Sequence, residues 1–206
     1  MSHILDQEPL VTAIHKFWFG PLDAEGRTTP DIMQQWFTKN PEFDRTIHKK
    51  FGEYVDVAFM GAFDRWIKSD TALVALIVLL DQLPRNMFRD TPRSFAYDKK
   101  ALATMWHAVE GDRYLQMPTL HGYFALMPSM HAENLEVQDF GVKAFAKLLN
   151  HAPEAHKPVI ASALRYAEAH QAIISRFGRF PHRNAILGRE STAEEVAFLK
   201  EPGSSF

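Results

Sequence analysis

The sequence predicts an all-α protein, and three observations support this prediction. Proline and glycine stand mostly at the edges of segments with helical periodicity, where proline suits a first turn and glycine a left-handed cap. No run of about four to eight residues alternates apolar and polar side chains between turn residues. The chain also lacks the Asn-Gly and Asp-Gly pairs that mark β-hairpins.

The boundary residues define the helices of the N-terminal part in order. Gly20 stops the first helix, Thr29-Pro30 opens the second and Asn40-Pro41 opens the third, in which Gly52 and Gly61 introduce a bend or a break. These helices are expected over residues 9–19, 30–36 and 41–67.

The segment from Thr71 to Leu83 is apolar on all sides and is therefore expected to be a central, buried helix. Pro84 should end it, because proline has no N–H and its ring clashes with the preceding turn. The longest apolar run, Ala72 to Leu80, is about half the length that a membrane span needs.

The remaining helices follow from similar signals. Asp98 is expected to cap a helix that Gly111 stops, Gly178 closes a long helix, and Ser191 to Glu194 reads as a capping box. These helices are expected over residues 99–110, 118–127, 134–150, 154–177 and 193–200. The short connections favour antiparallel helix hairpins stacked as a bundle or a short α/α superhelix.

The chain of 206 residues fits a single domain, 1–206, with a frayed tail over about 201–206. Lys and Arg number 23 against 25 Asp and Glu, so no overall positive charge attracts nucleic acid or a membrane surface. The chain has no cysteine, and its start shows no basic and then apolar signal segment. A cytoplasmic protein with no nucleic-acid or membrane partner is expected.

Several motifs for metals, cofactors and nucleophiles are missing. The sequence contains no His-Glu-x-x-His, di-iron Glu-x-x-His or EF-hand pattern, so no metal site is expected. It also lacks a Gly-x-Ser-x-Gly elbow, a Walker loop and a Gly-x-Gly-x-x-Gly turn. No cofactor is therefore expected.

Arginines gather in two short windows that contain no lysine, at residues 85–93 and 176–189. Arginine binds carboxylates or phosphates through a planar fork and tolerates partial burial. The two windows are expected to meet in one polar pocket although roughly 90 positions separate them. The expected ligand-binding residues are Arg85, Asn86, Arg89, Arg179, His182, Arg183 and Asn184.

A second interpretation makes these arginines structural. Arg85 and Arg183 would then satisfy helix C-terminal carbonyls and carboxylates such as Asp81 or Glu190.

Two histidines, His131 and His182, are candidates for proton transfer. His131 and Glu133 stand at a helix entry, where a contact from the ring N–H to the carboxylate would orient a general base. The alternative is that Glu133 or Asn134 only caps the next helix and that His131 packs on the surface. His170 falls on the inward face of its helix, near the second arginine window. A lone histidine on an apolar face is more often a hydrogen-bonded core residue than a ligand.

Four motifs together resemble a known family. They are Phe17-Trp18-Phe19-Gly20, residues 81–89 (DQLPRNMFR), residues 127–133 (MPSMHAE) and residues 176–189 (RFGRFPHRNAILGR). This set is similar to the uncharacterised bacterial family called domain of unknown function nine-two-four. The resemblance implies an all-α, tetratricopeptide-repeat-like fold and carries no assigned catalytic residues.

Two functions fit these residues. The first is a helical binding module whose arginines and asparagines hold a small anionic ligand or an acidic peptide segment. The second is an enzyme acting on a small anionic substrate, with Arg85, Arg179 and Arg183 as an anion clamp and His131 or His182 as general acid and base.

Overall fold

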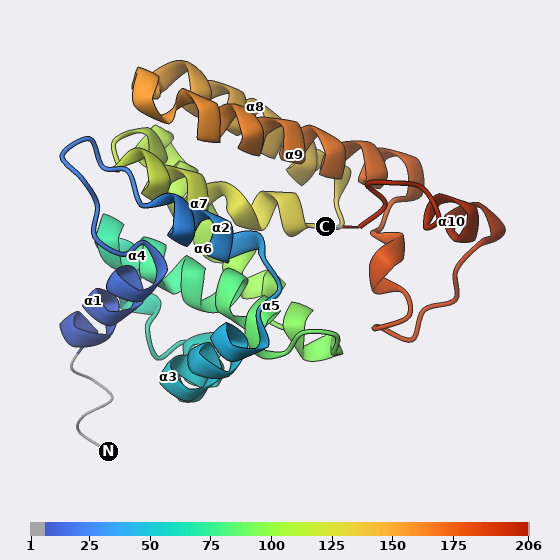
Figure 1. Cartoon of the computed structure of the whole chain (residues 1–206), viewed down its shortest axis with the longest axis horizontal. Coiled ribbons are helices and arrows are strands. Elements are labelled where there is room, and N and C mark those ends of the chain that lie inside the picture. Colours follow the sequence, from blue (N-terminus) through green and yellow to red (C-terminus); the bar gives the residue numbers. More distant parts are fainter. Residues whose placement is uncertain (1–6, 206) are drawn as a thin grey trace.

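The computed structural model describes residues 7–205, and every regular element in this range is helical. The all-α prediction is therefore confirmed. The α-helices are α1 (Gln7–Trp18), α2 (Pro30–Phe37), α3 (Pro41–Phe59), α4 (Asp70–Ile77), α5 (Leu83–Met87), α6 (Asp98–Val109), α7 (Thr119–His131), α8 (Leu135–His151), α9 (Lys157–Phe177) and α10 (Ala193–Phe198). Figure 1 shows their arrangement.

Side-chain caps fix several helix starts where the sequence predicts them. Thr29 accepts a hydrogen bond from the amide of Ile32 at the start of α2, and Asn40 accepts from the first turn of α3. Helix α3 stops at Phe59, before the expected end at Ile67, because the chain turns at Gly61 with φ +96°.

The helical chain continues past Pro84, which was expected to end the central helix. Between α4 and α5 the chain forms a π-helix, Val78–Gln82, in which the amide of Leu83 donates to the carbonyl of Val78. Pro84 then lies in the first turn of α5, where its missing N–H is tolerated. Helix α7 contains Pro128 and ends at His131, four residues beyond the end expected at Met127.

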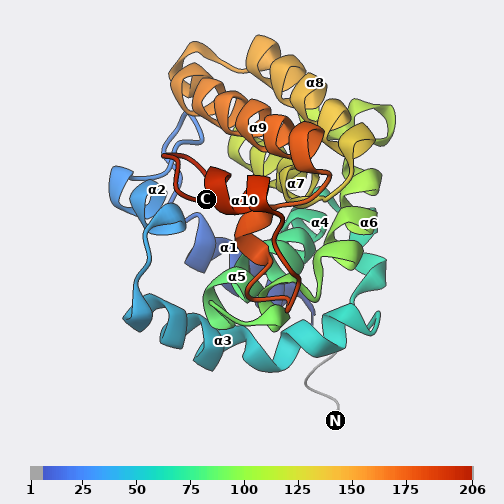
Figure 2. The same cartoon turned by 90° about the vertical axis from the view of Figure 1, so that its right-hand side faces the viewer.

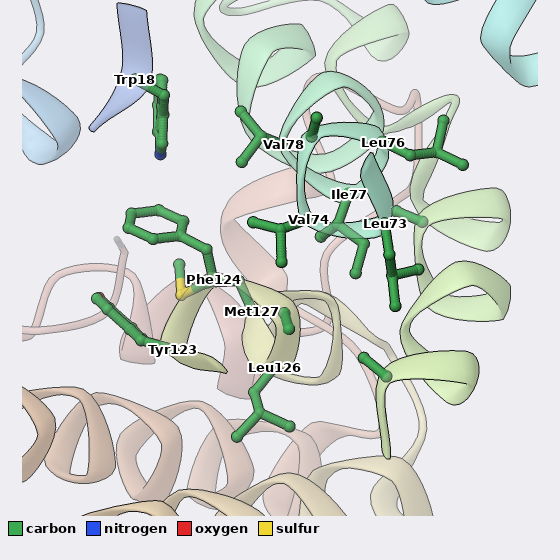
Figure 3. Close-up of a cluster of buried hydrophobic side chains, with 14 of the residues drawn as sticks. Trp18, Leu73, Val74, Leu76, Ile77, Val78, Tyr123, Phe124, Leu126 and Met127 are labelled. Carbon is green, nitrogen blue, oxygen red and sulfur yellow. The ribbon is translucent and has the colours of Figure 1, made fainter. Parts of the chain in front are cut away.

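The core forms where α4 and the π-helix pack against α7. Leu73 to Leu80 are at most 1% exposed, which confirms that this segment is central. Figure 3 shows side chains of α4, such as Val74 and Ile77, filling the space beside Phe124 and Met127 of α7.

The other helices are layered around this centre. Helices α6, α7, α8 and α9 pack successively, and α8 and α9 form a long antiparallel hairpin that lies side by side in Figures 1 and 2. This arrangement is a helical bundle. The finer expectation of a tetratricopeptide-repeat-like superhelix stays a prediction.

The C-terminal segment, residues 178–200, follows α9 and faces the viewer in Figure 2. It packs on the end of α9 through a separate apolar cluster of Ile173, Ile174, Phe177, Phe180 and Phe198. Helix α10 has the expected capping box one residue later than predicted, with Thr192 and Glu195 as its members.

Residues 201–205, which were expected to fray, form a turn instead. The buried Ser204 hydroxyl donates to the carbonyl of Leu199, which ties the turn to the end of α10. Phe206 lies outside the described residues. No helix within residues 7–205 combines the length and hydropathy needed to cross a membrane.

Candidate functional site

The two arginine windows meet at Asp98, the first residue of α6. Nη2 of Arg85 lies 2.8 Å from Oδ1 of Asp98, and Nη1 of Arg183 lies 3.4 Å from Oδ2. We call Asp81, Arg85, Asp98, His131 and Arg183 the polar junction. Asp98 was expected to cap α6, but its carboxylate binds these two guanidiniums instead, and no side-chain cap forms there.

The π-helix places Asp81 in the polar junction. Its carboxylate is fully buried and accepts a 2.7 Å hydrogen bond from Nδ1 of His131. It also accepts a hydrogen bond from the side-chain amide of Gln82, and Nη2 of Arg85 lies 3.5 Å away. Burial acts to raise the pKa of Asp81, but His131, Arg85 and the hydrogen bonds lower it to about 2. Asp81 is therefore ionised at neutral pH.

His131 is the last residue of α7 and its side chain is 13% exposed. Burial, and after it the Arg85 guanidinium, lower the pKa of His131 below its usual 6.5, against the opposing charge of Asp81. The ring is therefore neutral at pH 7. An ionised carboxylate only accepts hydrogen bonds, so the proton sits on Nδ1 and Nε2 carries the lone pair.

Arg183 is held between two aromatic rings. Its guanidinium carbon lies 4.5 Å from the ring centre of Phe95 and 4.6 Å from that of Phe180. Nη2 donates to the main-chain carbonyl of His131 at 3.1 Å, which caps the end of α7 as the structural interpretation of this arginine expects.

The two arginines of the polar junction differ in how well their charge is compensated. Burial acts to lower the pKa of Arg85, but Asp98 and Asp81 raise it above its usual value. Burial and then repulsion from Arg85 lower the pKa of Arg183 to about 10, because Asp98 and Glu133 offset only part of this. The buried Nε atoms of both side chains have no hydrogen-bond partner.

Two further histidines lie beside the polar junction. The ring centre of His170 is 6.4 Å from that of His131 and 5.5 Å from that of Phe180, and the ring centre of His182 is also 5.5 Å from that of Phe180. Burial, and to a smaller extent the neighbouring His131, lower the pKa of His170 to about 3. Burial, and to a smaller extent the charge of Arg183, lower the pKa of His182 to about 4. The inward placement predicted for His170 is confirmed.

Glu133 does not orient His131, as its position in the sequence suggested. Arg189 donates hydrogen bonds to both oxygens of its carboxylate, at 2.7 and 2.9 Å. The main-chain amide of Phe180 also donates to this carboxylate, at 2.8 Å. It therefore anchors the C-terminal segment to the chain that follows α7.

Arg179 and Asn184 form their hydrogen bonds within the C-terminal segment. Arg179 binds both carboxylate oxygens of Glu195, and the Asn184 amide donates to Ser191 and Glu195 while its oxygen accepts from Arg189. The predicted clamp of three arginines is therefore reduced to Arg85 and Arg183.

Asn86 and Arg89 point to a different partner. Both donate to the carboxylate of Asp44 in α3, Arg89 through two nitrogens at 2.9 and 3.1 Å. The structure therefore does not bring them to His131 or Arg183.

The roles of Asp98 and Phe95 at the polar junction were not predicted from the sequence, and Asp81 was predicted only as a structural partner of the arginines. A signal for Asp81 was available, because a carboxylate directly after a helix that is apolar on all sides must itself be buried and paired. The sequence marks Asp98 only as a helix cap, and nothing in it indicates that its carboxylate binds Arg85 and Arg183. Within residues 7–205, no group of three or more His, Asp or Glu is placed to hold a metal ion.

The comparisons with known proteins agree with the resemblance seen in the sequence. A solved structure of a protein of unknown function from Agrobacterium tumefaciens, ATU0120, superposes with a TM-score of 0.79 at 32% identity, covering 95% of this chain and 99% of that one. No curated protein matches the chain. The family model described as bacterial protein of unknown function (DUF924) matches residues 14–203. Because that match spans nearly the whole sequence, this chain belongs to the DUF924 family.

Proposed function

We propose that this protein is an enzyme that acts on a small anionic substrate, with His131 as general acid and base. The observation that carries this proposal is the 2.7 Å contact between Nδ1 of His131 and the buried Asp81 carboxylate. A carboxylate on one ring nitrogen fixes the tautomer and leaves the other nitrogen to take or give a proton.

The surroundings of His131 suit this role. Its lowered pKa keeps Nε2 unprotonated at neutral pH, so the ring is ready to accept a proton. When the ring becomes charged, the adjacent Asp81 stabilises it. Arg183 supplies a positive charge that is only partly balanced within the protein, which favours a negative group on the substrate.

A helical binding module for an anionic ligand or acidic peptide is the second candidate. It would use the same Arg183, and that incompletely balanced charge favours it. Against it, Arg85, Arg89, Arg179 and Arg189 are already bound by carboxylates of the chain itself. A binder would also have no need of the Asp81–His131 pair.

Turnover of a panel of small anions tests the proposal. Phosphate monoesters and esters or amides of small dicarboxylates should include a compound that the wild type converts and that His131→Gln converts about 10²- to 10⁴-fold more slowly. His107, an exposed residue of α6, gives a matched control: His107→Gln should keep the wild-type rate.

Two outcomes would overturn the enzyme proposal. One is turnover that His131→Gln leaves unchanged. The other is a panel in which no compound is converted while an anion still binds in an Arg183-dependent manner, which would favour the binding module.

A further inference from the structure

His131 and His170 are anchored in the same way although they lie on different helices. Nδ1 of His131 donates to Asp81 and Nδ1 of His170 donates to the main-chain carbonyl of Tyr166, one turn earlier in α9, both at 2.7 Å. A carbonyl, like an ionised carboxylate, only accepts hydrogen bonds. Each ring therefore carries its proton on Nδ1, and an additional proton enters at Nε2.

This anchoring lets either ring become charged without moving. An imidazolium has N–H groups on both nitrogens, so the Nδ1 hydrogen bond persists when Nε2 gains a proton. The protonated Nε2 is then a charge-assisted donor for an anion. The ring centres are 6.4 Å apart, close enough that a single charge near them acts on both.

The groups around the pair explain why both rings are neutral when no anion is bound. Burial and the guanidiniums of Arg85 and Arg183 disfavour an imidazolium, whereas the carboxylates favour it. The charged and titratable groups that act on the pair are Asp81 from the π-helix, Arg85 from α5, Asp98 from α6, and His182 and Arg183 from the C-terminal segment.

An anion beside Arg183 would reverse this balance. It would offset the repulsion from both guanidiniums and stabilise a charged imidazole within a few ångströms. We propose that the site binds a small oxyanion, a phosphate or carboxylate group, together with one proton, which is held on Nε2 of His131 or His170. This inference rests on the anionic substrate proposed above and adds that proton uptake accompanies its binding.

The dependence of affinity on pH separates this site from one built of arginine alone. Arginines keep their charge throughout the range from pH 5 to 8, so an arginine site would bind a permanent dianion equally well across it. A site that takes up one proton with the anion binds that anion about tenfold more weakly for each unit that the pH rises. This holds between the pKa of the ring in the free protein and its higher pKa in the complex. For His170 the lower limit of that range is about 3.

Sulfate is the probe of choice, because it stays a dianion from pH 5 to 8 and does not titrate itself. Its association constant with the wild-type protein, measured by calorimetry at constant ionic strength set with chloride, should fall about tenfold per pH unit over part of this range. The variant that lacks the ring holding the proton, either His131→Gln or His170→Gln, should flatten this dependence, whereas His107→Gln should retain it. Arg183→Ala should abolish sulfate binding.

Nitrogen NMR of the histidine rings gives a second readout that needs no variant at the pair. At pH 5, saturating sulfate should convert one of the two rings of the wild type to the imidazolium signal pattern, and equal ionic strength of chloride should not. A sulfate affinity independent of pH, or two rings that stay neutral in the complex, would overturn the inference. Neither result would decide whether His131 is a general base. The turnover of His131→Gln tests that separately.

Discussion

The central helix and the C-terminal segment are stabilised by different interactions. From Leu73 to Leu80 the chain buries only apolar side chains, whose contribution depends on the area removed from water. Besides its small apolar cluster at the end of α9, the C-terminal segment is held by polar contacts: Arg183 binds Asp98, and Glu133 accepts from Arg189 and from the amide of Phe180. The first region should therefore respond to the loss of volume, and the second to the loss of charge and to pH.

The largest expected change in the free energy of unfolding comes from a cavity in the core. Leu79→Ala should lower the free energy of unfolding by about 2–5 kcal/mol, because Leu79 is fully buried and its neighbours can close the cavity only in part. Urea denaturation measures this change. Met60→Ala is the control: Met60 is 82% exposed, so its truncation should change the stability by less than about 0.5 kcal/mol. A loss below about 1 kcal/mol for Leu79→Ala would contradict the central position of this helix.

Removing one charge from the C-terminal anchor should have a smaller effect. Glu133→Gln keeps an acceptor for the Phe180 amide but loses the charged, two-point contact with Arg189, which should lower the free energy of unfolding by about 1.5–3 kcal/mol. The loss should come with faster hydrogen exchange at the amide of Phe180. The exposed Glu168 gives the matched control, since Glu168→Gln should leave both measurements near the wild type. Unchanged exchange at Phe180 would mean that other contacts hold the segment.

The two regions also differ in how far the sequence predicts them. The central helix was predictable because its apolar composition leaves one placement, in the core, and the capping signals at Thr29 and Asn40 act within a few residues. The continuation past Pro84 was not, because a π-helix depends on tertiary packing that a local steric rule does not contain.

For the candidate site, the sequence indicated which residues take part more reliably than it indicated which residues contact one another. The sequence singled out Arg85, Arg183 and His131, which do lie together, but it paired His131 with Glu133. The true partner, Asp81, is 50 positions away and faces His131 only because the π-helix and α7 pack against each other in the core. Contacts of this kind come from the fold, so neighbours in the sequence cannot supply them.

The pH dependence of stability should distinguish the two regions. The pKa values of His170 and His182 are about 3 and about 4 in the folded protein, against 6.5 for an ordinary histidine. Below pH 6.5 the unfolded chain therefore binds protons that the folded chain does not, and stability falls as the pH drops toward 4. Each such histidine contributes a slope of up to about 1.4 kcal/mol per pH unit.

Asp81 acts over a lower range of pH. Its pKa is depressed to about 2, so its contribution to stability is complete above about pH 4 and is lost as the pH falls through about 2. Urea titrations from pH 4 to 8 should thus report the histidines. His170→Gln should reduce the slope, and Leu79→Ala should shift the whole curve down without changing it. Parallel curves for the wild type and His170→Gln would show that His170 is not held neutral in the folded state.

The smallest expected effect is stabilisation by an anion, and it isolates Arg183 from the other arginines. Millimolar phosphate, sulfate or a small dicarboxylate should raise the melting temperature of the wild type beyond a chloride control of equal ionic strength, by about 2–4 °C for each kcal/mol of binding free energy. Arg183→Ala should abolish this shift, and Arg183→Lys should recover little of it, because an ammonium does not reproduce the planar fork of a guanidinium. Arg89→Ala should keep the shift, since Arg89 is bound at two points by Asp44 and has no part in the polar junction. If all four proteins respond alike to every anion, Arg183 is already satisfied by Asp98 and the His131 carbonyl. The anionic ligand would then be withdrawn, and the polar junction would be an internal network that fixes the C-terminal segment.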